Sequence, residues 1–532
     1  MASIFPSSVV KFFTAVPLDD TYQNTLYFDT LADQLTYFNS LTPLQTLQAN
    51  QYTRVTDGEF QANCEIGQLY NANYMMFQNT SYENKWFFAL VTSVDYVNDH
   101  NCRVHFTLDV MQTWMFDITL GASFIERQHS ATDEIGDNIL PEPVSPGEYV
   151  FAEYEQLMPD GQTVNGLKDY KLAVLVCDTG TGATVNCRVY DECVAGGYIT
   201  VYNTDANAIA ALNEQLAPYA ARPEAIVAMY MVPRLAIGAV TIPDGGAQLA
   251  STYHGQSAGV LKSALDGTET FGGYTPKNKK LYTYPYNYYH VDNGNGDSSA
   301  FRYEFFSTGT PRFKIETCIL PPVQVKLMPV NYKGQTGNNP VNSEFLTISG
   351  YPLCSWNYDS YKAWQAQNAI PTIIKAGVGA LGLIAAPFTG GASLMATAIS
   401  GASIAGSAAS QAYQASMHAD VCKGNIAAGN VNFSQESMQY YGGRCHITRQ
   451  QAVVIDDFFT MYGYAYNKVS IPNPKRRPKW YYVKTVGANI VGSCPADDLR
   501  KIINIYDSGV TFWHNASEVG SYWLDNSIPT EG

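Results

Sequence analysis

The sequence lacks the short motifs that hold metal ions or activate nucleophiles. None of its 10 cysteines belongs to a CxxC pair, and its 8 histidines form no HxxxH or HExxH motif. Zinc sites are built from ligands at such spacings. We therefore expect reduced thiols, no metal, no cofactor and no catalytic residues, and we do not expect an enzyme.

The sequence is also poor in basic residues. Its 32 lysines and arginines stand against 47 acidic residues, which gives a formal net charge of -15. Such a surface does not attract nucleic acid, and it suits a surface past which nucleic acid slides without sticking. The first residues, MASIFPSSVVKFF, lack the charged region and the long apolar run of a signal peptide, so none is expected.

What the sequence does contain favours β-structure. Tyrosine occurs 38 times, and turns rich in Gly, Asn, Asp and Pro recur. The clearest pattern is a hairpin whose turn contains Asn98–Asn101. In its second strand Val104, Phe106, Leu108 and Val110 alternate with Arg103, His105, Thr107 and Asp109. Period-2 alternation places the first set in a core and the second set toward solvent.

Helices are expected at only a few places. Asp205 to Pro218 has apolar residues at helical spacing (Ile209, Leu212, Leu216) behind a possible N-cap, Asp205. A second helix is expected between Pro495 and Gly509, followed by a strand in GVTFW. The Tyr-, Gly- and Asn-rich stretch from Thr268 to Asp297 indicates an exposed β-excursion or a long loop.

Three short motifs have a plain interpretation beside a functional one. Gly377, Gly379 and Gly382 spell GxGxxG, but the next acid is Asp420, too distant to hold a ribose. Ser257 lies in a GxSxG motif, yet no Asp-then-His order follows, and His290 falls in a Tyr-rich stretch. We interpret Ser257 as a helix-start residue. The one dense basic cluster, in PNPKRRPKW, is interpreted as an exposed loop that is solvated or docks a partner, rather than as a nucleic-acid patch. Its basic residues are Lys475, Arg476, Arg477 and Lys479.

The most unusual stretch is an apolar segment late in the chain. After Lys375 no Asp, Glu, Lys or Arg appears until Asp420. Pro387, Gly390 and Gly391 are turn residues, so a hairpin with two arms is expected, Thr372 to Ala386 and Ala392 to about Tyr413. At ~1.5 Å per residue the first arm reaches only ~22 Å, short of a ~30 Å hydrocarbon core.

Three interpretations of this hairpin remain open from its residues. It is a buried core hairpin, a constitutive membrane span, or a sequestered segment that is later released to a membrane. Gly401, Ala405 and Ala409 form a stripe of small residues that permits close helix packing. The bulkier apolar residues need a dry partner: Ile373, Ile374, Leu381, Leu383, Ile384, Phe388, Leu394, Met395, Ile399 and Ile404.

Longer strings point to a family. Near the N-terminus these are GQLYNANYMMFQNTSYENKWFFALVTSVDY, VHFTLDVMQTWMF and ASFIERQH, and near the C-terminus DDFFTMYGYAYNKVSIPNPKRRPKWYYVKTV and DDLRKIINIYDSGVTFWHNASEVGSYW. They resemble the distal tail knob proteins of phi29-like short-tailed phages. YDSYKAWQAQNAIP, residues 358–371, resembles the family segment that leads into a long apolar loop.

The resemblance implies a mainly β fold with inserted helices, a multi-domain β-barrel-type tail tube subunit that assembles as a homohexameric tube. In that family the apolar loops of six subunits plug the distal end of the tube. On infection they leave the lumen and form a pore in the host cytoplasmic membrane, through which the genome passes. Gln367 to about Asn432 here matches that loop. Expected partners are other tail proteins (proximal tail tube or collar, tail tip), passing double-stranded DNA and the host membrane, and the expected location is the virion.

The same resemblance implies a domain organisation. It comprises an N-terminal β-rich tube domain (1–147), a middle β-rich region with a short helix and Tyr-rich loops (148–355), a lead-in helix with the membrane-active loop (356–432), and a C-terminal α+β segment that completes the tube domain (433–532). Two other functions stay open. One is a purely structural or receptor-binding tail protein whose hairpin is permanently buried, and the other is a tail-associated cell-wall hydrolase.

Overall fold

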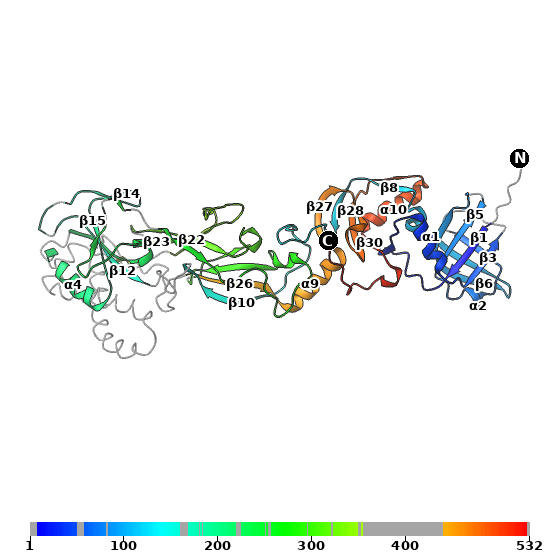
Figure 1. The fold of residues 1–532 in the computed structure, drawn as a ribbon, viewed down its shortest axis with the longest axis horizontal. Helices are drawn as coiled ribbons and strands as arrows, with labels where there is room; N and C mark the ends of the chain where they lie inside the picture. Colours follow the sequence, from blue (N-terminus) through cyan, green and yellow to red (C-terminus); the bar gives the residue numbers. More distant parts are fainter. Residues whose placement is uncertain are drawn as a thin grey trace, which may run out of the picture. The chain divides into compact units, whose positions relative to one another are not determined.

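The computed structural model describes residues 8–49, 58–80, 83–159, 169–179, 181–183, 185–216, 218–219, 225–250, 252–253, 257–294, 296–320, 323–348, 353–354 and 440–528. Over these residues the protein is mainly β with inserted helices, as predicted (Figure 1). It divides into two compact units, each assembled from separated stretches of chain. Unit 1 comprises Met1–Gly147, Thr270–Leu281 and Thr448–Gly532, and unit 2 comprises Glu148–Glu269 and Tyr282–Ile447.

Unit 1 contains three sheets. The first has the order β3 (Gln45–Ala49), β1 (Ser8–Phe13), β5 (Tyr74–Asn79), β6 (Trp86–Asn98), β7 (Asn101–Leu108) and β4 (Gly58–Ala62). The second has the order β2 (Asn24–Leu26), β30 (Val510–Trp513), β28 (Trp480–Val486), β9 (Ser123–Gln128) and β27 (Tyr464–Ser470), and the third pairs β29 (Ile490–Gly492) with β8 (Ile118–Leu120). The helices are α1 (Leu31–Ser40), α2 (Ile66–Leu69), α3 (Val110–Trp114), α9 (Arg449–Tyr462) and α10 (Ala496–Ser508), with 3-10 turns η8 (Pro474–Arg476) and η9 (Ala516–Glu518).

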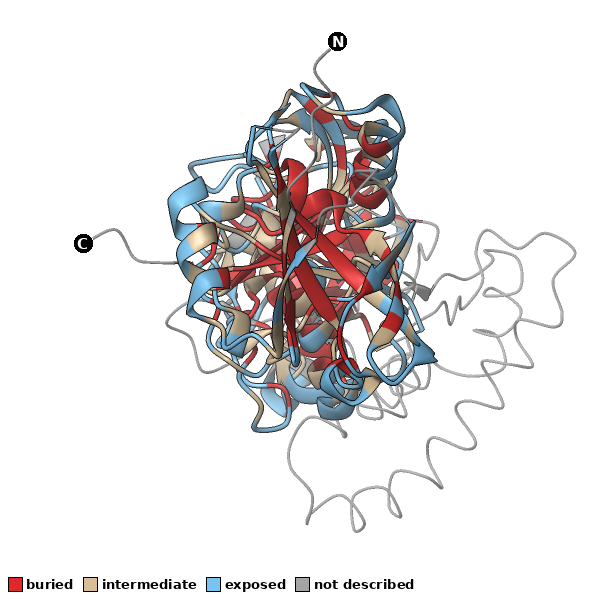
Figure 2. Ribbon diagram, turned by 90° about the vertical axis from the view of Figure 1, so that its right-hand side faces the viewer, coloured by how far each residue is buried: buried red, intermediate tan, exposed pale blue. Residues whose placement is uncertain are grey.

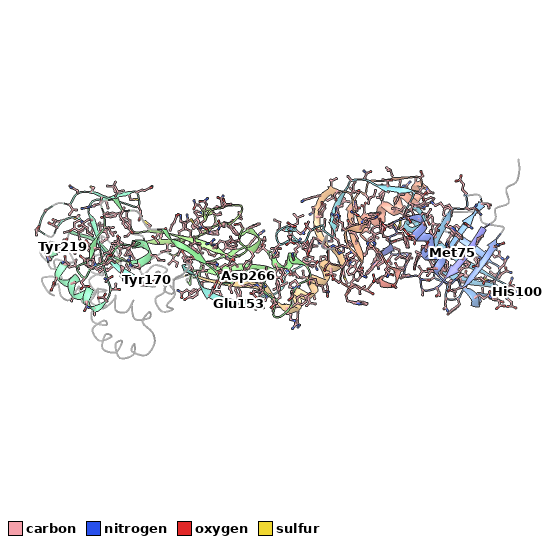
Figure 3. The ribbon with its side chains drawn as sticks, viewed as in Figure 1. Met75, His100, Glu153, Tyr170, Tyr219 and Asp266 are labelled. Atoms are coloured by element: carbon pink, nitrogen blue, oxygen red, sulfur yellow. The ribbon has the colours of Figure 1, made fainter. Side chains whose placement is uncertain are left out.

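The predicted hairpin is confirmed as β6 and β7, with His100 at its turn and Met75 on the neighbouring β5 (Figure 3). Val104, Phe106 and Leu108 are buried, as the alternation predicts. The prediction for Asp109 is wrong, because this residue is buried. The strand ends before it, and its carboxylate caps α3 by accepting from the Gln112 N–H and from the Tyr74 hydroxyl. Burial raises the pKa of Asp109 to about 6.

The two ends of the chain meet in the second sheet of unit 1. β2 pairs in parallel with β30, and β30 pairs with β28. The rings of Trp480 and Trp513 lie 5.0 Å apart in the core at this junction. The predicted C-terminal helix and strand are confirmed as α10 and β30, with Gly509 between them at φ 97°.

A short excursion of the chain, Thr270–Leu281, is built into unit 1. Asp456 of α9 is fully buried, and its carboxylate accepts hydrogen bonds from the Tyr274 hydroxyl (2.6 Å), the Lys277 N–H (2.7 Å) and the Asn278 N–H (3.0 Å). Lys280, in the 3-10 turn η4 (Lys279–Tyr282), forms an ion pair with buried Glu142.

The described residues of unit 2 form four sheets. The first has the order β10 (Tyr149–Gln156), β26 (Tyr441–Ile447), β20 (Asn287–Asp292) and β21 (Ser298–Phe301). The second has the order β11 (Met158–Pro159), β19 (Ser257–Lys262), β22 (Arg312–Cys318), β23 (Gln324–Pro329) and β24 (Leu346–Ile348). The third has the order β17 (Ala247–Gln248), β15 (Tyr198–Tyr202), β12 (Tyr170–Val176), β16 (Ile226–Pro233) and β25 (Leu353–Cys354), and the fourth has the order β14 (Cys193–Ala195), β13 (Arg188–Tyr190) and β18 (Thr252–Tyr253). The helices are α4 (Ala206–Leu216), which confirms the prediction there, α5 (Arg234–Ile237) and the 3-10 turn η5 (Tyr303–Phe305).

The Tyr-rich stretch from Thr268 to Asp297 is not an exposed loop. Phe271, Leu281 and Tyr289 have no exposed surface, and β20 lies in the interior of a sheet. The prediction failed because tyrosine supplies as much apolar ring area as phenylalanine, and this area is buried while the hydroxyls find partners. Figure 2 shows buried residues grouped inside and exposed residues around them.

The sheets of the described residues are open rather than barrel-type. Each has two different edge strands, for example β3 and β4 in the first sheet of unit 1. Within the same residues, no helix has the length and apolar character needed to cross a bilayer.

Candidate functional site

The residues predicted to act on a membrane lie outside the described residues. This holds for the bulky apolar residues from Ile373 to Ile404, for the small-residue stripe Gly401, Ala405 and Ala409, and for the turn residues Pro387, Gly390 and Gly391. The structure instead shows how the flanking chain is attached. β25 precedes the segment and β26 follows it, and both belong to unit 2.

The two attachment strands lie in different sheets. β25 is an edge strand, and its Leu353 and Cys354 pair with Tyr230 and Met229 of β16. β26 lies inside its sheet, between β10 and β20. The intervening chain therefore begins at the margin of one sheet and returns into the middle of another.

The return point is fixed by Tyr440, which has no exposed surface. Its hydroxyl donates to the Val325 carbonyl (2.8 Å) or the Leu346 carbonyl (3.0 Å), and its own carbonyl accepts from the Leu157 N–H (3.0 Å). One side chain thus joins the start of β26 to β23 and β24. These contacts fix the start of β26 in unit 2.

Removing this hydroxyl is expected to destabilise unit 2. The Tyr440→Phe variant removes the single donor that these two buried carbonyls share, which costs about 1–3 kcal/mol. Urea unfolding of the full chain checks this. The matched control is Tyr284→Phe, because that ring is 38% exposed and a change there stays within about 0.5 kcal/mol. Equal losses in the two variants would show that Tyr440 is no special anchor.

Two consecutive glycines follow the return point. A Cβ on Gly442 would lie 1.9 Å from the Tyr289 hydroxyl, and a Cβ on Gly443 would lie 2.4 Å from the Tyr154 ring. The missing side chains let aromatic rings of β10 and β20 lie across β26 on both faces. Glycine in a strand interior commonly marks such a close approach.

Buried polar groups complete the anchor. Arg444 of β26 donates to the Asn287 side chain (2.9 Å) and to the Glu269 carbonyl (2.7 Å), and burial lowers its pKa. The Tyr289 hydroxyl donates to Glu155 of β10 at 2.9 Å. These hydrogen bonds join β26 to β20 and β20 to β10.

The alternative hydrolase interpretation of the GxSxG motif gains no support from the described residues. Ser257 begins strand β19, where it pairs with Glu316, so its interpretation as a helix-start residue is wrong. His290 lies in β20 of a different sheet, with its ring against Phe151. The GxGxxG motif lies outside the described residues. Among those residues, no cluster of three or more His, Cys, Asp and Glu could hold a metal.

The basic cluster is only partly an exposed loop. Arg477 is buried, and its guanidinium donates to the carbonyls of Asn526 and Ser130. Lys475 forms an ion pair with Asp29 and Lys479 with Glu518, each at 2.6 Å. The expectation failed for Arg477 because carbonyl oxygens satisfy its charge inside unit 1.

Sequence reasoning missed the anchor residues Tyr440, Gly442, Gly443 and Arg444. The signal was the Gly-Gly pair in YYGGRCHI, because two glycines inside an aromatic strand indicate a close approach of other side chains.

Comparisons with known proteins identify the family to which this fold belongs. Residues 252–527 match the family described as Bacillus phage phi29, tail knob protein gp9, C-terminal domain, and residues 6–119 match the caudoviral major tail protein N-terminus. The tail knob proteins gp9 of Bacillus phages B103 and phi29 are each 25% identical, over 98% of both chains. The solved tail knob protein gp12 of bacteriophage C1 superposes with a TM-score of 0.63 at 14% identity, over 98% of this chain and 100% of that one. The chain therefore belongs to the family of the phi29 tail knob protein gp9 and is a structural component of a phage tail.

Proposed function

We propose that six copies of this chain form a tube at the tip of the tail, and that their apolar segments plug it before ejection. On infection the segments leave the lumen and enter the host cytoplasmic membrane, where six hairpins surround a hole for the genome. Six copies can satisfy the backbone hydrogen bonds of a pore that one copy cannot.

One observation carries this proposal. The run from Lys375 to Asp420 contains no charged residue between its ends, and strands β25 and β26 of unit 2 flank the larger stretch that contains it. Such a segment needs a dry environment, yet its Gly and Ala content keeps it less apolar than an ordinary membrane anchor. Packing among symmetry mates and later insertion into lipid meets both conditions.

The charge of the chain supports the conduit. A formal net charge of -15 on each copy repels phosphate rather than binding it. Double-stranded DNA would then pass without specific contacts. The proposal includes docking to the proximal tail tube or collar and to a tail-tip protein, and it requires no catalysis.

Deleting residues 377–410 is expected to abolish membrane permeabilisation. Dye release from lipid vesicles should fall to the level of vesicles without protein, because no apolar arm remains to enter the bilayer. A variant in which a Gly-Ser segment of equal length replaces the same residues controls for chain length and should also fail to release dye. Ring formation, seen by negative-stain electron microscopy, should persist in both. Dye release equal to that of the intact protein would refute the pore.

A further inference from the structure

Within the described part of unit 2, the sheet of β10, β26, β20 and β21 has an unpaired edge at β10. Among the described residues β10 pairs with β26 alone, and residues 150–154 are all exposed. Phe151 and Tyr154 are 55% and 51% exposed, and both lie toward the same face, against His290 and Tyr441. An edge strand that carries exposed aromatic side chains is a template for pairing with another chain.

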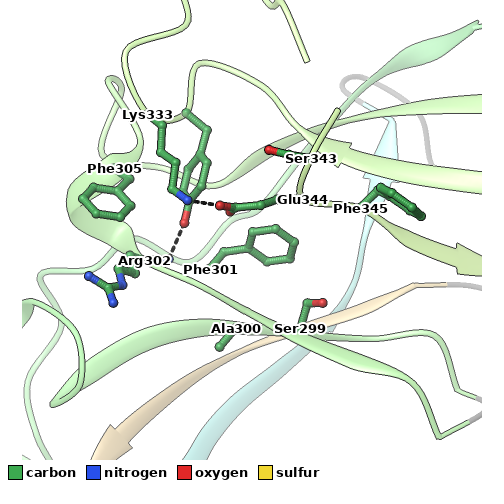
Figure 4. A pocket seen from close by; sticks show the side chains of 10 residues that line it. Ser299, Ala300, Phe301, Arg302, Phe305, Lys333, Ser343, Glu344 and Phe345 are labelled. Atoms are coloured by element: carbon green, nitrogen blue, oxygen red, sulfur yellow. Dashed lines mark hydrogen bonds and ion pairs between the residues drawn. The ribbon is translucent and has the colours of Figure 1, made fainter. Parts of the chain in front are cut away.

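The opposite edge of the same sheet borders a groove. β21 pairs with β20 alone within the described residues, and an open pocket of about 650 Å³ lies along its other side. In Figure 4, Ser299 and Ala300 of β21 lie across from Ser343, Glu344 and Phe345. The exposed residues of β21 are small, Ser298 and Ala300, so they leave room for the large side chains of an incoming strand.

The strand directions of the two edges fit each other. Each neighbouring pair in the sheet is antiparallel, so β10 and β21 run in opposite directions. A rotation that brings β10 of one copy beside β21 of the next therefore produces an antiparallel pair. This contact joins two different patches, and a contact of that kind forms a ring when its rotation closes.

The charges of the two edges are also complementary. Arg302 lies over the rings of Tyr284 (4.3 Å) and Phe305 (5.2 Å) and interacts electrostatically with Glu304, although within the described residues no carboxylate lies close enough to form an ion pair with it. Lys333, on the same groove, is paired with Glu344. On the β10 side the exposed residues Glu148 and Glu153 carry negative charge.

We infer that β10 of one copy lies in the groove beside β21 of the next copy and extends the sheet from subunit to subunit. The occupant of the groove is a second copy of this chain, and the inference rests on the proposed ring assembly. It names the surfaces through which the ring forms.

The first test adds charge to the exposed edge. Phe151 and Tyr154 are replaced together by lysine, and the ring fraction is measured by mass photometry over a range of concentrations. The subunit concentration at half assembly should rise by at least about tenfold. The control Tyr96→Lys changes a residue of β6 that is 61% exposed, and it should assemble like wild type. Unfolding curves establish that each variant is folded.

The second test uses other variants, so it applies even if the variant with lysine at positions 151 and 154 does not fold. The variants Glu153→Arg and Arg302→Glu should each assemble poorly, and the double variant should recover. A 1:1 mixture of the two single variants should also recover, because in an alternating ring each contact pairs opposite charges. Absence of recovery in both the double variant and the mixture, or full assembly of the lysine variant, overturns the inference alone. Failure of the wild type to form rings overturns the proposed assembly with it.

Discussion

Replacement of Glu142 by alanine is expected to lower the free energy of unfolding of unit 1 by about 3–5 kcal/mol. The Glu142 side chain has 0% exposure and lies between Arg127 and Lys280, which are 8% and 2% exposed. Its carboxylate also accepts from the Ala465 N–H at 2.9 Å. Without it two cations remain buried and lack their partner. Burial already lowers the pKa of Lys280, and Glu142 partly offsets that effect.

Glu134 supplies a matched control, because its partner Lys279 is the neighbour of Lys280 in the sequence. Lys279 pairs with Glu134 at 3.0 Å, but these side chains are 45% and 75% exposed. The Glu134→Ala variant should therefore cost no more than about 1 kcal/mol. Urea unfolding of the full chain, followed by the fluorescence of the core residues Trp480 and Trp513, measures both. A Glu142 variant as stable as the Glu134 variant would show that the buried network does not stabilise unit 1.

Replacement of Asp456 by alanine is the second change with a large expected effect. Its carboxylate accepts four hydrogen bonds from three residues of the 270–281 excursion, two of them buried, from Asn278, and two partly buried, from Tyr274 and Lys277. Leaving these donors unpaired should cost at least about 3 kcal/mol. Buried Phe271 and Leu281, and the ion pair of Lys280 with Glu142, still attach the two ends of the excursion, so the loss should appear first as local opening around residues 274–278.

Limited proteolysis with mass spectrometry distinguishes local opening from global unfolding. Cleavage within 270–281 should appear in the Asp456→Ala variant under conditions in which the wild type resists it. Asp457 is the neighbouring exposed residue on the same helix, so Asp457→Ala keeps the helix and should cleave like wild type. Resistance of the Asp456 variant in this assay would show that other contacts hold the excursion.

Local patterns predicted the elements whose cause is local. The alternation in β7 revealed its buried face, and Pro495 with Gly509 bounded α10, because strand period and helix caps act over a few residues. The pattern failed at Asp109, where the strand ends and a helix begins. It failed at Arg477 and over 268–297, where partners from distant parts of the chain satisfy charges and hydroxyls.

The anchors of the apolar segment depend on such distant partners. Tyr440 reaches residues 115 and 94 positions away, and no local period reports that. The Gly-Gly pair is the one feature of the sequence that indicates this anchor. The family was recognisable because long strings near both ends of the sequence resemble it. These strings lie largely in unit 1, where β2 and β30 pair.

The interleaving of the two units has a consequence for biosynthesis. β2 leaves the ribosome early, but its neighbour β30 follows only after nearly the whole chain, including the apolar segment, has been translated. Unit 2 is therefore expected to mature on the nascent chain first, while the second sheet of unit 1 still lacks β27, β28 and β30. The late emergence of β30, rather than emergence of the N-terminus, sets the moment at which unit 1 can close.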